Sequence, residues 1–161
     1  MPFYTNKAVI GLKMKNELSI LNALAGVIQR QLSIHLEENL ASIGERNVAI
    51  DFPDTDQMSM KTMFYIQPNW ADYENLSTES DLSTFGISVF IVCKKDTQEN
   101  LTKKTYGYFN ALYELLRTNI SLDGEVDFAS ITDADFYPAV EGNRNIQAIE
   151  ASITVTYTKD F

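Results

Sequence analysis

The sequence predicts an α+β protein in which a mainly antiparallel sheet packs with two main helices. The expected order is one helix, three strands, a second helix and two or three further strands, so strands gather between the helices instead of alternating with them. The clearest strand is the last, where apolar and polar residues alternate without a break from Ile149 to Tyr157. Such alternation is typical of a strand with one buried face and one wet face.

The length predicts a single domain. The chain has 161 residues, 45% of them hydrophobic, which is enough for one core. Residues 1–15 are expected to form an N-terminal arm or a short edge strand, and residues 16–161 one α+β domain. The apolar run from Ala8 to Leu12 is too short to span a membrane. The only cysteine, Cys93, allows no internal disulfide, so a cytosolic protein is expected.

The first helix is predicted to begin at Asn16, a good N-cap residue, and to end near Gly44, unless its length makes it break earlier. Most of its apolar residues share one broad face. A second, narrower stripe on another side consists of Ile20, Val27 and Ile34. This stripe needs its own cover, which is either a neighbouring subunit or another part of the same chain.

Three strands are predicted between the helices from their apolar patterns. They cover residues 47–52, 60–67 and 83–94. The third has apolar residues on both faces and is therefore expected to be central in the sheet. The single tryptophan, Trp70, lies in the loop-like stretch PNWADY, where it is either an interface anchor or a plug for the loop.

The second helix is predicted to start at Asp96 and Glu99, which have the spacing of a capping box, and to continue to about Asn119. Strands are then expected at residues 125–131 and 135–140, before the long last strand. Because Pro138 cannot donate a ladder hydrogen bond, the segment that contains it is predicted to be an edge or irregular strand. Residues 141–143, with the sequence EGN, are the expected turn into the last strand.

The formal net charge of −9 argues against direct binding to nucleic acid or to an anionic membrane, because both favour patches of Lys and Arg. The same acidity suits a highly soluble protein or a surface that repels DNA. No membrane partner is therefore predicted.

Side chains with catalytic potential are few. His35 is the only histidine and borders the broad apolar face of the first helix. Cys93 falls on the apolar face of the predicted central strand, where cysteine packs as a small hydrophobe. No local signature brings these two residues together as a catalytic pair. The chain is predicted not to be an enzyme, and no catalytic, cofactor-binding or metal-binding residue is assigned.

Two stretches are weak metal candidates. Residues 119–130 match a calcium loop at positions one, three, five, six and nine. These positions hold Asn119, Ser121, Asp123, Gly124 and Asp127. Position twelve is Ser130 instead of a bidentate carboxylate, and a strand is expected to follow, so a solvated turn is the favoured interpretation, with Gly124 supplying a special backbone angle. Residues 51–56, DFPDTD, bring three carboxylates together around a proline, for which a wet loop is favoured over a divalent-ion site.

The layout resembles the tail terminator, or tail-completion, proteins of long-tailed bacteriophages and related contractile particles. An N-terminal helix leads into a strand that ends in an acidic, proline-containing loop. A later strand feeds the second helix, and a proline-containing segment ends in a long two-faced strand. The segments that carry the resemblance are LSILNALAGVIQRQLSIHL, STFGISVFIVCKK, ENLTKKTYGYFNALYELLR and ADFYPAVEGNRNIQAIEASITVTY. Residues 1–15 and 68–82 lie outside it.

The resemblance implies an α/β-sandwich-like subunit that joins others into a ring, expected to be hexameric. The ring would cap the tail tube, stop its growth and present a surface to the head–tail connector protein, while DNA passes through the centre without specific binding. The expected subunit contact is the stripe of Ile20, Val27 and Ile34. The loops expected to face the lumen or a partner carry Asp51, Asp54, Asp56, Asp133 and Asp135. Assembly would take place in the host cytoplasm, and the protein would end in the virion tail or neck.

Other functions stay open. Another neck protein, such as a head-closure or adaptor protein, would bind the portal side without stopping tube growth. A structural domain of a contractile particle would polymerise by itself. A cytosolic enzyme or small-ligand domain would be a monomer or dimer with one concave pocket, lined by aromatic residues such as Phe64, Tyr65 and Trp70.

Overall fold

The structure is a computed structural model that describes residues 17–96 and 100–160. It contains two α-helices, α2 and α3, and five strands, β1 to β5, together with three short 3-10 turns. In chain order these elements are α2 (Glu17–Gln31), a 3-10 turn (Leu32–His35), a second (Glu45–Asn47), β1 (Val48–Ala49), a third (Thr55–Gln57), β2 (Thr62–Asn75), β3 (Ser80–Lys94), α3 (Leu101–Thr118), β4 (Phe128–Tyr137) and β5 (Ile146–Asp160).

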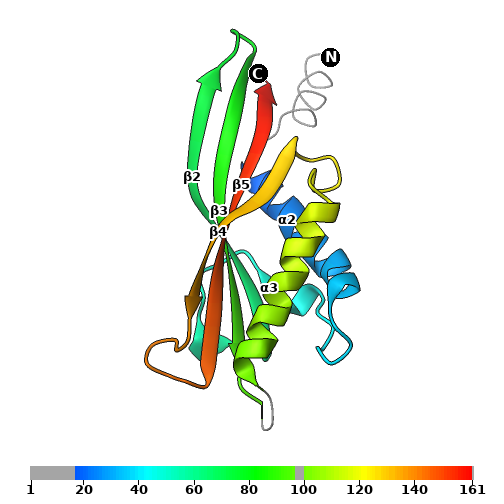
Figure 1. The fold of residues 1–161 in the computed structure, drawn as a ribbon. Helices are drawn as coiled ribbons and strands as arrows, with labels where there is room; N and C mark the ends of the chain where they lie inside the picture. Colours follow the sequence, from blue (N-terminus) through cyan, green and yellow to red (C-terminus); the bar gives the residue numbers. More distant parts are fainter. Residues whose placement is uncertain (1–16, 97–99, 161) are drawn as a thin grey trace, which may run out of the picture.

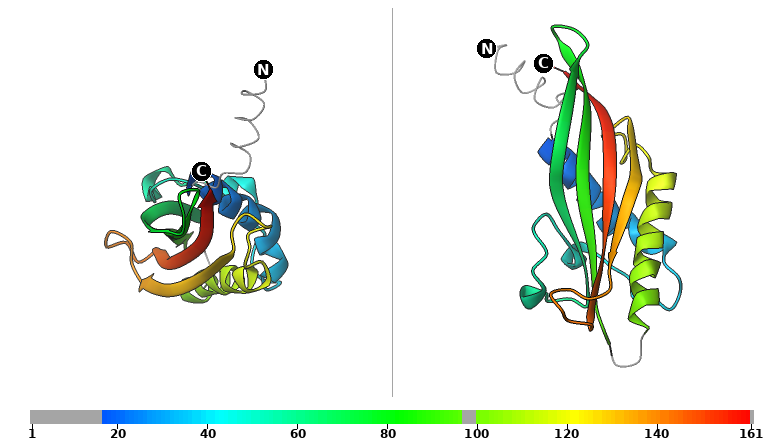
Figure 2. Two further views of the ribbon diagram at one scale, coloured as in Figure 1. Left: turned by 90° about the horizontal axis from the view of Figure 1, so that it is seen from above. Right: turned by 60° about the vertical axis from the view of Figure 1, so that its left-hand side comes forward.

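The five strands form one sheet in the order β1-β2-β3-β5-β4. The short β1 pairs parallel with β2, and all other neighbours pair antiparallel. Both helices lie on the same face of the sheet, and the β2–β3 hairpin extends beyond them at one end (Figures 1 and 2). The predicted α+β class with a mainly antiparallel sheet and two main helices is confirmed.

The main core lies between the helices and the face of the sheet that they cover. The alternating residues of β3 from Phe85 to Cys93 point into it, as do Ala151, Ile153, Val155 and Tyr157 of β5. The prediction that the last strand has one buried face is therefore confirmed. We call this side of the sheet the helix side and the opposite side the helix-free side.

A second, smaller apolar cluster lies on the helix-free side, at the end of the sheet away from the β2–β3 turn. Its buried residues are Met63, Tyr65, Val92, Ile146 and Ala148, and Met58, Met60 and Val140 pack against them. The segments before β2 and before β5 therefore cover this end of the helix-free side. The rest of that side has no such cover among the described residues.

The first helix breaks before Gly44, as its predicted length allowed, and its predicted start at Asn16 lies outside the described residues. It ends at Gln31, continues as a 3-10 turn to His35, and gives way to extended backbone at Leu36. The Ser33 hydroxyl donates to the Ile43 carbonyl at 3.1 Å and accepts from the Ile43 amide at 3.0 Å. These two bonds fold the chain back in a loop where a longer helix would have run straight.

The strands around the central hairpin also differ from the prediction. The expected strand at residues 47–52 shrinks to two residues, whereas β2 runs on through the stretch predicted to be a loop. A bulge between Pro68 and Trp70 shifts the register there. Because of this bulge, Trp70 lies on the helix-free side, directly opposite Gly86 of β3.

After α3 the structure has one strand where two were predicted. β4 is continuous, has a bulge between Ile131 and Asp133, and ends immediately before Pro138. The turn at residues 141–143 is confirmed, with positive φ at Glu141 and Gly142. The N-cap of α3 is Asn100, whose side chain accepts from the Lys103 amide. The predicted capping box includes Glu99, which lies outside the described residues.

Gly86 is required by the indole that covers it. A Cβ at this position would overlap the Nε1 and Cε2 atoms of Trp70. We therefore expect Gly86→Ala to displace the indole, which is 43% exposed in the native protein, further into water. Because Trp70 is the only tryptophan, a red shift of the intrinsic fluorescence would report this directly. An unshifted spectrum would contradict it, and Gly44→Ala, which has open space, is the matched control.

Candidate functional site

The predicted contact stripe on the first helix does not form a surface. Ile20 and Val27 are 0% and 1% exposed and belong to the main core, whereas Ile34 is 77% exposed on the 3-10 turn after the helix. The prediction of a subunit contact is therefore wrong for Ile20 and Val27. The alternative, that another part of the same chain covers the stripe, is the correct one for them. Only Ile34 remains available to a partner.

Apart from the exposed rings of Trp70 and Phe128, the helix-free side of the sheet is mainly polar and acidic where nothing covers it. Along β5 it carries Thr154, Thr156 and Thr158, and along β2, beyond the bulge, Asp72 and Glu74. The acids of β2 and the threonines of β5 flank the same positions of β3. This uncovered part of the helix-free side is called the acidic face below.

The bulge in β4 determines which side Asp133 and Asp135 occupy. Before the bulge Ile131 pairs with Ile153 of the core, but after it Asp133 pairs with Ser152 and Asp135 with Glu150. An extra residue in one strand reverses the alternation beyond it. Both aspartates thus lie exposed on the acidic face, in a strand and not in the loop that was predicted.

Glu150 connects the acidic face across three strands. Its carboxylate accepts a hydrogen bond from the Ser88 hydroxyl of β3 at 2.9 Å and another from the Tyr137 hydroxyl of β4 at 3.1 Å. The bond to Glu150 raises the pKa of Tyr137, and burial and the charges of Glu150 and Asp135 raise it further. These contacts hold an anionic group at the centre of the sheet.

The basic residues of these strands do not lie on the acidic face. Within β2, β3, β4 and β5 the basic residues are Lys94, at the covered end, and Lys159. Lys159 lies on the helix side, where its Nζ is 3.6 Å from Glu17 and 5.2 Å from the ring centre of Tyr73. The acidic face therefore has no basic side chain of its own strands to offset its charge.

The aspartates of the 51–56 segment have local structural roles. Asp54 caps the 3-10 turn by accepting from the Asp56 and Gln57 amides, and Asp51 accepts from the Phe52 amide. Burial raises the pKa of the nearby Tyr65, and the charges of Asp54 and Asp51 also raise it. Since Tyr65 lies on the helix-free side, this segment borders the same side of the sheet as the aspartates of β4.

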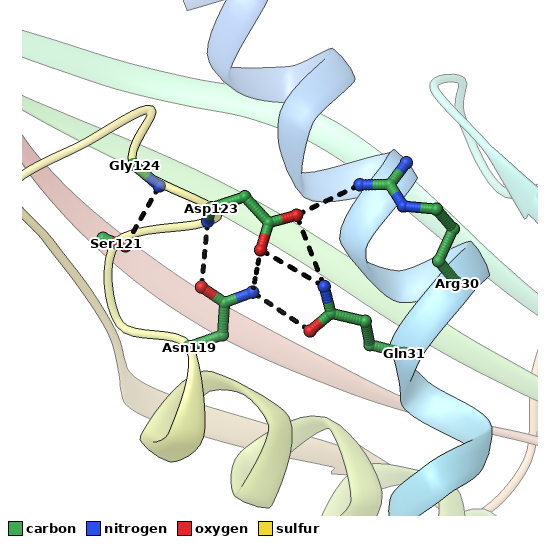
Figure 3. A network of polar contacts seen from close by, with 6 residues as sticks. All are labelled: Arg30, Gln31, Asn119, Ser121, Asp123 and Gly124. Carbon is green, nitrogen blue, oxygen red and sulfur yellow. Dashed lines mark hydrogen bonds and ion pairs between the residues drawn. The ribbon is translucent and has the colours of Figure 1, made fainter.

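The candidate calcium loop is held by protein groups. The Asp123 carboxylate accepts from Asn119 at 2.8 Å, from Gln31 at 3.2 Å and from Arg30 at 3.2 Å, which ties the α3–β4 connection to the end of α2 (Figure 3). Gly124 has φ of 87°, so the special backbone angle predicted for it is confirmed. Among residues 17–96 and 100–160, no group of three His, Cys, Asp or Glu side chains could hold a metal ion.

Asp123 is expected to make folding stability depend on pH. Hydrogen bonds from Asn119, Gln31 and Arg30 lower its pKa below the ordinary value of 3.8. A carboxyl with a lowered folded pKa contributes stability that is present above the unfolded pKa and lost as the pH falls through the folded pKa. Asp123→Asn should therefore lower the urea midpoint at pH 6 and have less effect at pH 3. An equal effect at both pH values would contradict this, and Asp127→Asn, an exposed change nearby, is the control.

The aromatic residues expected to line a small-ligand pocket lie on different parts of the sheet. Phe64 is buried on the helix side, Tyr65 lies on the helix-free side, and Trp70 covers Gly86 beyond the bulge in β2. They do not line a common pocket. A hollow of about 610 Å³ beside α3 is lined mainly by polar side chains. Cys93 is fully buried, and His35 lies 3.5 Å from the Thr118 hydroxyl.

An exposed aromatic surface was missed in the sequence. Tyr106, Phe109 and Tyr113 of α3 contact one another in series, and Phe136 of β4 joins them at 5.4 Å between ring centres of Tyr106 and Phe136. We call these four residues the aromatic strip. The spacing of the three α3 residues, three and four apart, was the signal that could have revealed it. None of the described helices is long and apolar enough to cross a bilayer.

Comparisons with known proteins show a likeness in structure and none in sequence. No protein-family model and no curated protein matches the sequence. Among solved structures, the chain is similar to the sheath/tube terminator of PVC, an extracellular contractile injection system, in its extended state. The identity is 14%, the TM-score is 0.43, and the match covers 92% of this chain but 58% of that chain.

Proposed function

We propose that the protein is a structural, non-enzymatic component of a phage or phage-like tail, a terminator that assembles as a hexameric ring. The ring caps the tail tube, stops its polymerisation and offers a docking surface to the head–tail connector protein. It assembles in the host cytoplasm and remains in the tail or neck of the particle. The layout of the sequence, with its two helices and long terminal two-faced strand, supports this assignment.

The acidic face is the observation that carries the proposal. Both helices cover one side of the sheet, so the uncovered part of the other side is free to line a channel (Figure 2). Its carboxylates include Asp72, Glu74, Asp133, Asp135 and Glu150. A channel wall of this charge repels phosphates, so DNA can pass without being held by ion pairs. A small-ligand enzyme has no evident use for an exposed anionic sheet face.

Negative-stain electron microscopy of the purified protein tests the proposal. The protein would be imaged alone and mixed with assembling tail-tube subunits, with and without magnesium. We expect closed rings with a central hole, and tubes that are capped at one end and stop at a uniform length. Small featureless particles together with tubes of unrestricted length, in every condition, would contradict the terminator function.

A head-closure or adaptor protein is the second candidate. It shares the ring and the acidic channel, so the acidic face supports it equally, but it does not stop tube growth. Rings that bind connector protein while tubes grow unrestricted would favour the adaptor. The same microscopy therefore separates the two candidates.

A further inference from the structure

β4 presents an open edge. In the part of the chain that the structure describes, it pairs with β5 along one side only, and it ends the sheet. Its residues 132–137 are exposed on both faces. An edge of this length leaves a row of unpaired amide and carbonyl groups, which is a template for another strand.

The side chains of this edge are apolar on the helix side and acidic on the helix-free side. On the helix side, Ala134 and Phe136 continue into the aromatic strip of α3. On the helix-free side, Asp133 and Asp135 present two carboxylates. A strand that fits here needs apolar residues on one side and basic residues on the other.

The sequence of residues 7–15, KAVIGLKMK, has this pattern strictly over residues 12–15, where Leu12 and Met14 alternate with Lys13 and Lys15. The other even positions, Ala8 and Ile10, are also apolar, and the other odd positions hold Lys7, Val9 and Gly11. The first 16 residues contain no Asp or Glu, in a chain whose net charge is −9. Both the alternation and the charge are complementary to the open edge of β4.

We propose that residues 7–15 of a second copy of the chain pair with β4 as an antiparallel strand, with Lys15 opposite Asp133 and Lys13 opposite Asp135. In this register Met14 lies beside Ala134, and Leu12 lies beside Phe136. Directly opposed side chains on one face of a sheet are close enough to interact. The apolar side of the arm then covers the aromatic strip, and its lysines pair with the two aspartates. Asp72, Glu74 and Glu150 remain as the carboxylates that charge the channel wall.

Chain length excludes the molecule's own arm in this register. The Tyr73 hydroxyl donates to the Glu17 carboxylate, and Tyr73 lies level with Tyr157 because both pair with Ser83. Asp133 lies level with Ser152, five residues lower on β5, which is about 17 Å. A strand beyond β4 lies about 10 Å to the side of β5. The two residues from Lys15 to Glu17 span about 7 Å at most.

The contact is heterologous, because an arm on one molecule binds an edge on the next. Repeated contacts of this kind close into a ring when the rotation permits it. The inference deepens the proposed function and rests on its ring, because it names the contact that joins neighbouring subunits.

Cysteine cross-linking tests the pairing. Met14→Cys and Ala134→Cys are made in separate chains, which are then mixed and oxidised, so that any bond between the two positions joins different molecules. We expect a disulfide-linked dimer from the mixture and a ladder of oligomers from the double variant. The native Cys93 is buried and stays in place. Thr78→Cys, at the exposed tip of the β2–β3 hairpin, replaces Ala134→Cys as the collision control.

Either of two results would overturn the proposal. A double variant that cross-links only within a monomer, while the mixture gives no dimer, would show that the arm binds its own chain. No cross-link in either sample beyond that of the Thr78→Cys control would show that the arm does not occupy this edge.

Charge reversal tests the predicted register without oxidation. We expect Lys13→Glu with Lys15→Glu to weaken self-association about tenfold, and Asp133→Lys with Asp135→Lys to do the same. Combining all four changes should restore association, which a loss of folding could not do. Asp72→Lys with Glu74→Lys, on the same face but on β2, should not rescue the lysine reversal. If the quadruple variant does not regain self-association, the proposed register is wrong.

The two proposals fail in distinguishable ways. Cross-linked oligomers that do not cap tubes would overturn the terminator function and leave the arm exchange standing. Rings that cap tubes without cross-linking at Met14 and Ala134 would overturn the arm exchange alone.

Discussion

Replacing Val27 by aspartate is expected to unfold the protein, whereas the same replacement at Ile34, seven residues further on, should leave it folded. Val27 is 1% exposed within the main core, and Ile34 is 77% exposed. A buried carboxylate without a partner costs several kcal/mol, a large share of the roughly 5 to 15 kcal/mol that stabilises a typical domain. At an exposed position the expected change is within about 0.5 kcal/mol.

Circular dichroism shows whether each of the two variants is folded, and urea unfolding measures its stability. Leu18→Asp, at a position of α2 that is 63% exposed, is the control for placing an acid on this helix. A cooperative unfolding transition for Val27→Asp near that of the wild type would show that α2 is not covered as described. If Ile34 lies in a subunit contact, Ile34→Asp should in addition reduce ring formation without changing the urea midpoint.

This pair of residues shows what a helical pattern can and cannot predict. The helical wheel separated Ile20, Val27 and Ile34 from the broad face, but the structure buries Ile20 and Val27 in the main core and places Ile34 beyond the helix. Whether the chain or a partner covers that stripe depends on tertiary packing, which the periodicity of one helix does not contain. The loop from Leu36 to Gly44 turns back through the bonds between Ser33 and Ile43 and contacts α3, where the Ala41 carbonyl accepts a hydrogen bond from the Tyr108 hydroxyl. No local sequence pattern at Ser33 indicated that turn.

The strands were predictable where their alternation was regular and unpredictable at their bulges. β5 alternates from Ile149 to Tyr157, and its buried face follows directly. The bulges beside Trp70 and Asp133 reverse the faces of β2 and β4. A bulge depends on the pairing of two strands, so the sequence of one strand could not indicate it.

The candidate site was predictable only in part, because the bulges decide which side of the sheet its residues occupy. Asp133 and Asp135 were chosen as lumen or partner residues, and the structure places them on an exposed sheet face, although their function stays a prediction. The segment with Asp51, Asp54 and Asp56 borders the same side, but Asp51 and Asp54 also hold its local turns. The residues Asp72 and Glu74 were overlooked because their segment was expected to be a loop.

Converting part of the acidic face to a basic one is expected to make the protein bind DNA. Thr156→Lys with Thr158→Lys adds two ammonium groups on the helix-free side of β5, opposite Thr84 and Leu82 of β3. Both threonines are half-buried and polar, so the long lysine side chains can extend into water and the fold should be kept. If this side lines the channel, rings of the variant should still form and cap tubes, but they should hold the DNA that the native ring lets pass.

Fluorescence anisotropy with a duplex DNA fragment measures the gain at several salt concentrations. We expect the wild-type ring to show negligible binding and the variant ring to bind with a salt dependence of about 0.9 in log–log slope for each phosphate contacted. Asn110→Lys with Ser42→Lys adds the same charge at exposed positions on the helix side. Because only a channel wall meets DNA along its path, particles that carry the β5 variant should lose DNA delivery while those with the helix-side variant keep it. Equal delivery by both would place the acidic face outside the channel.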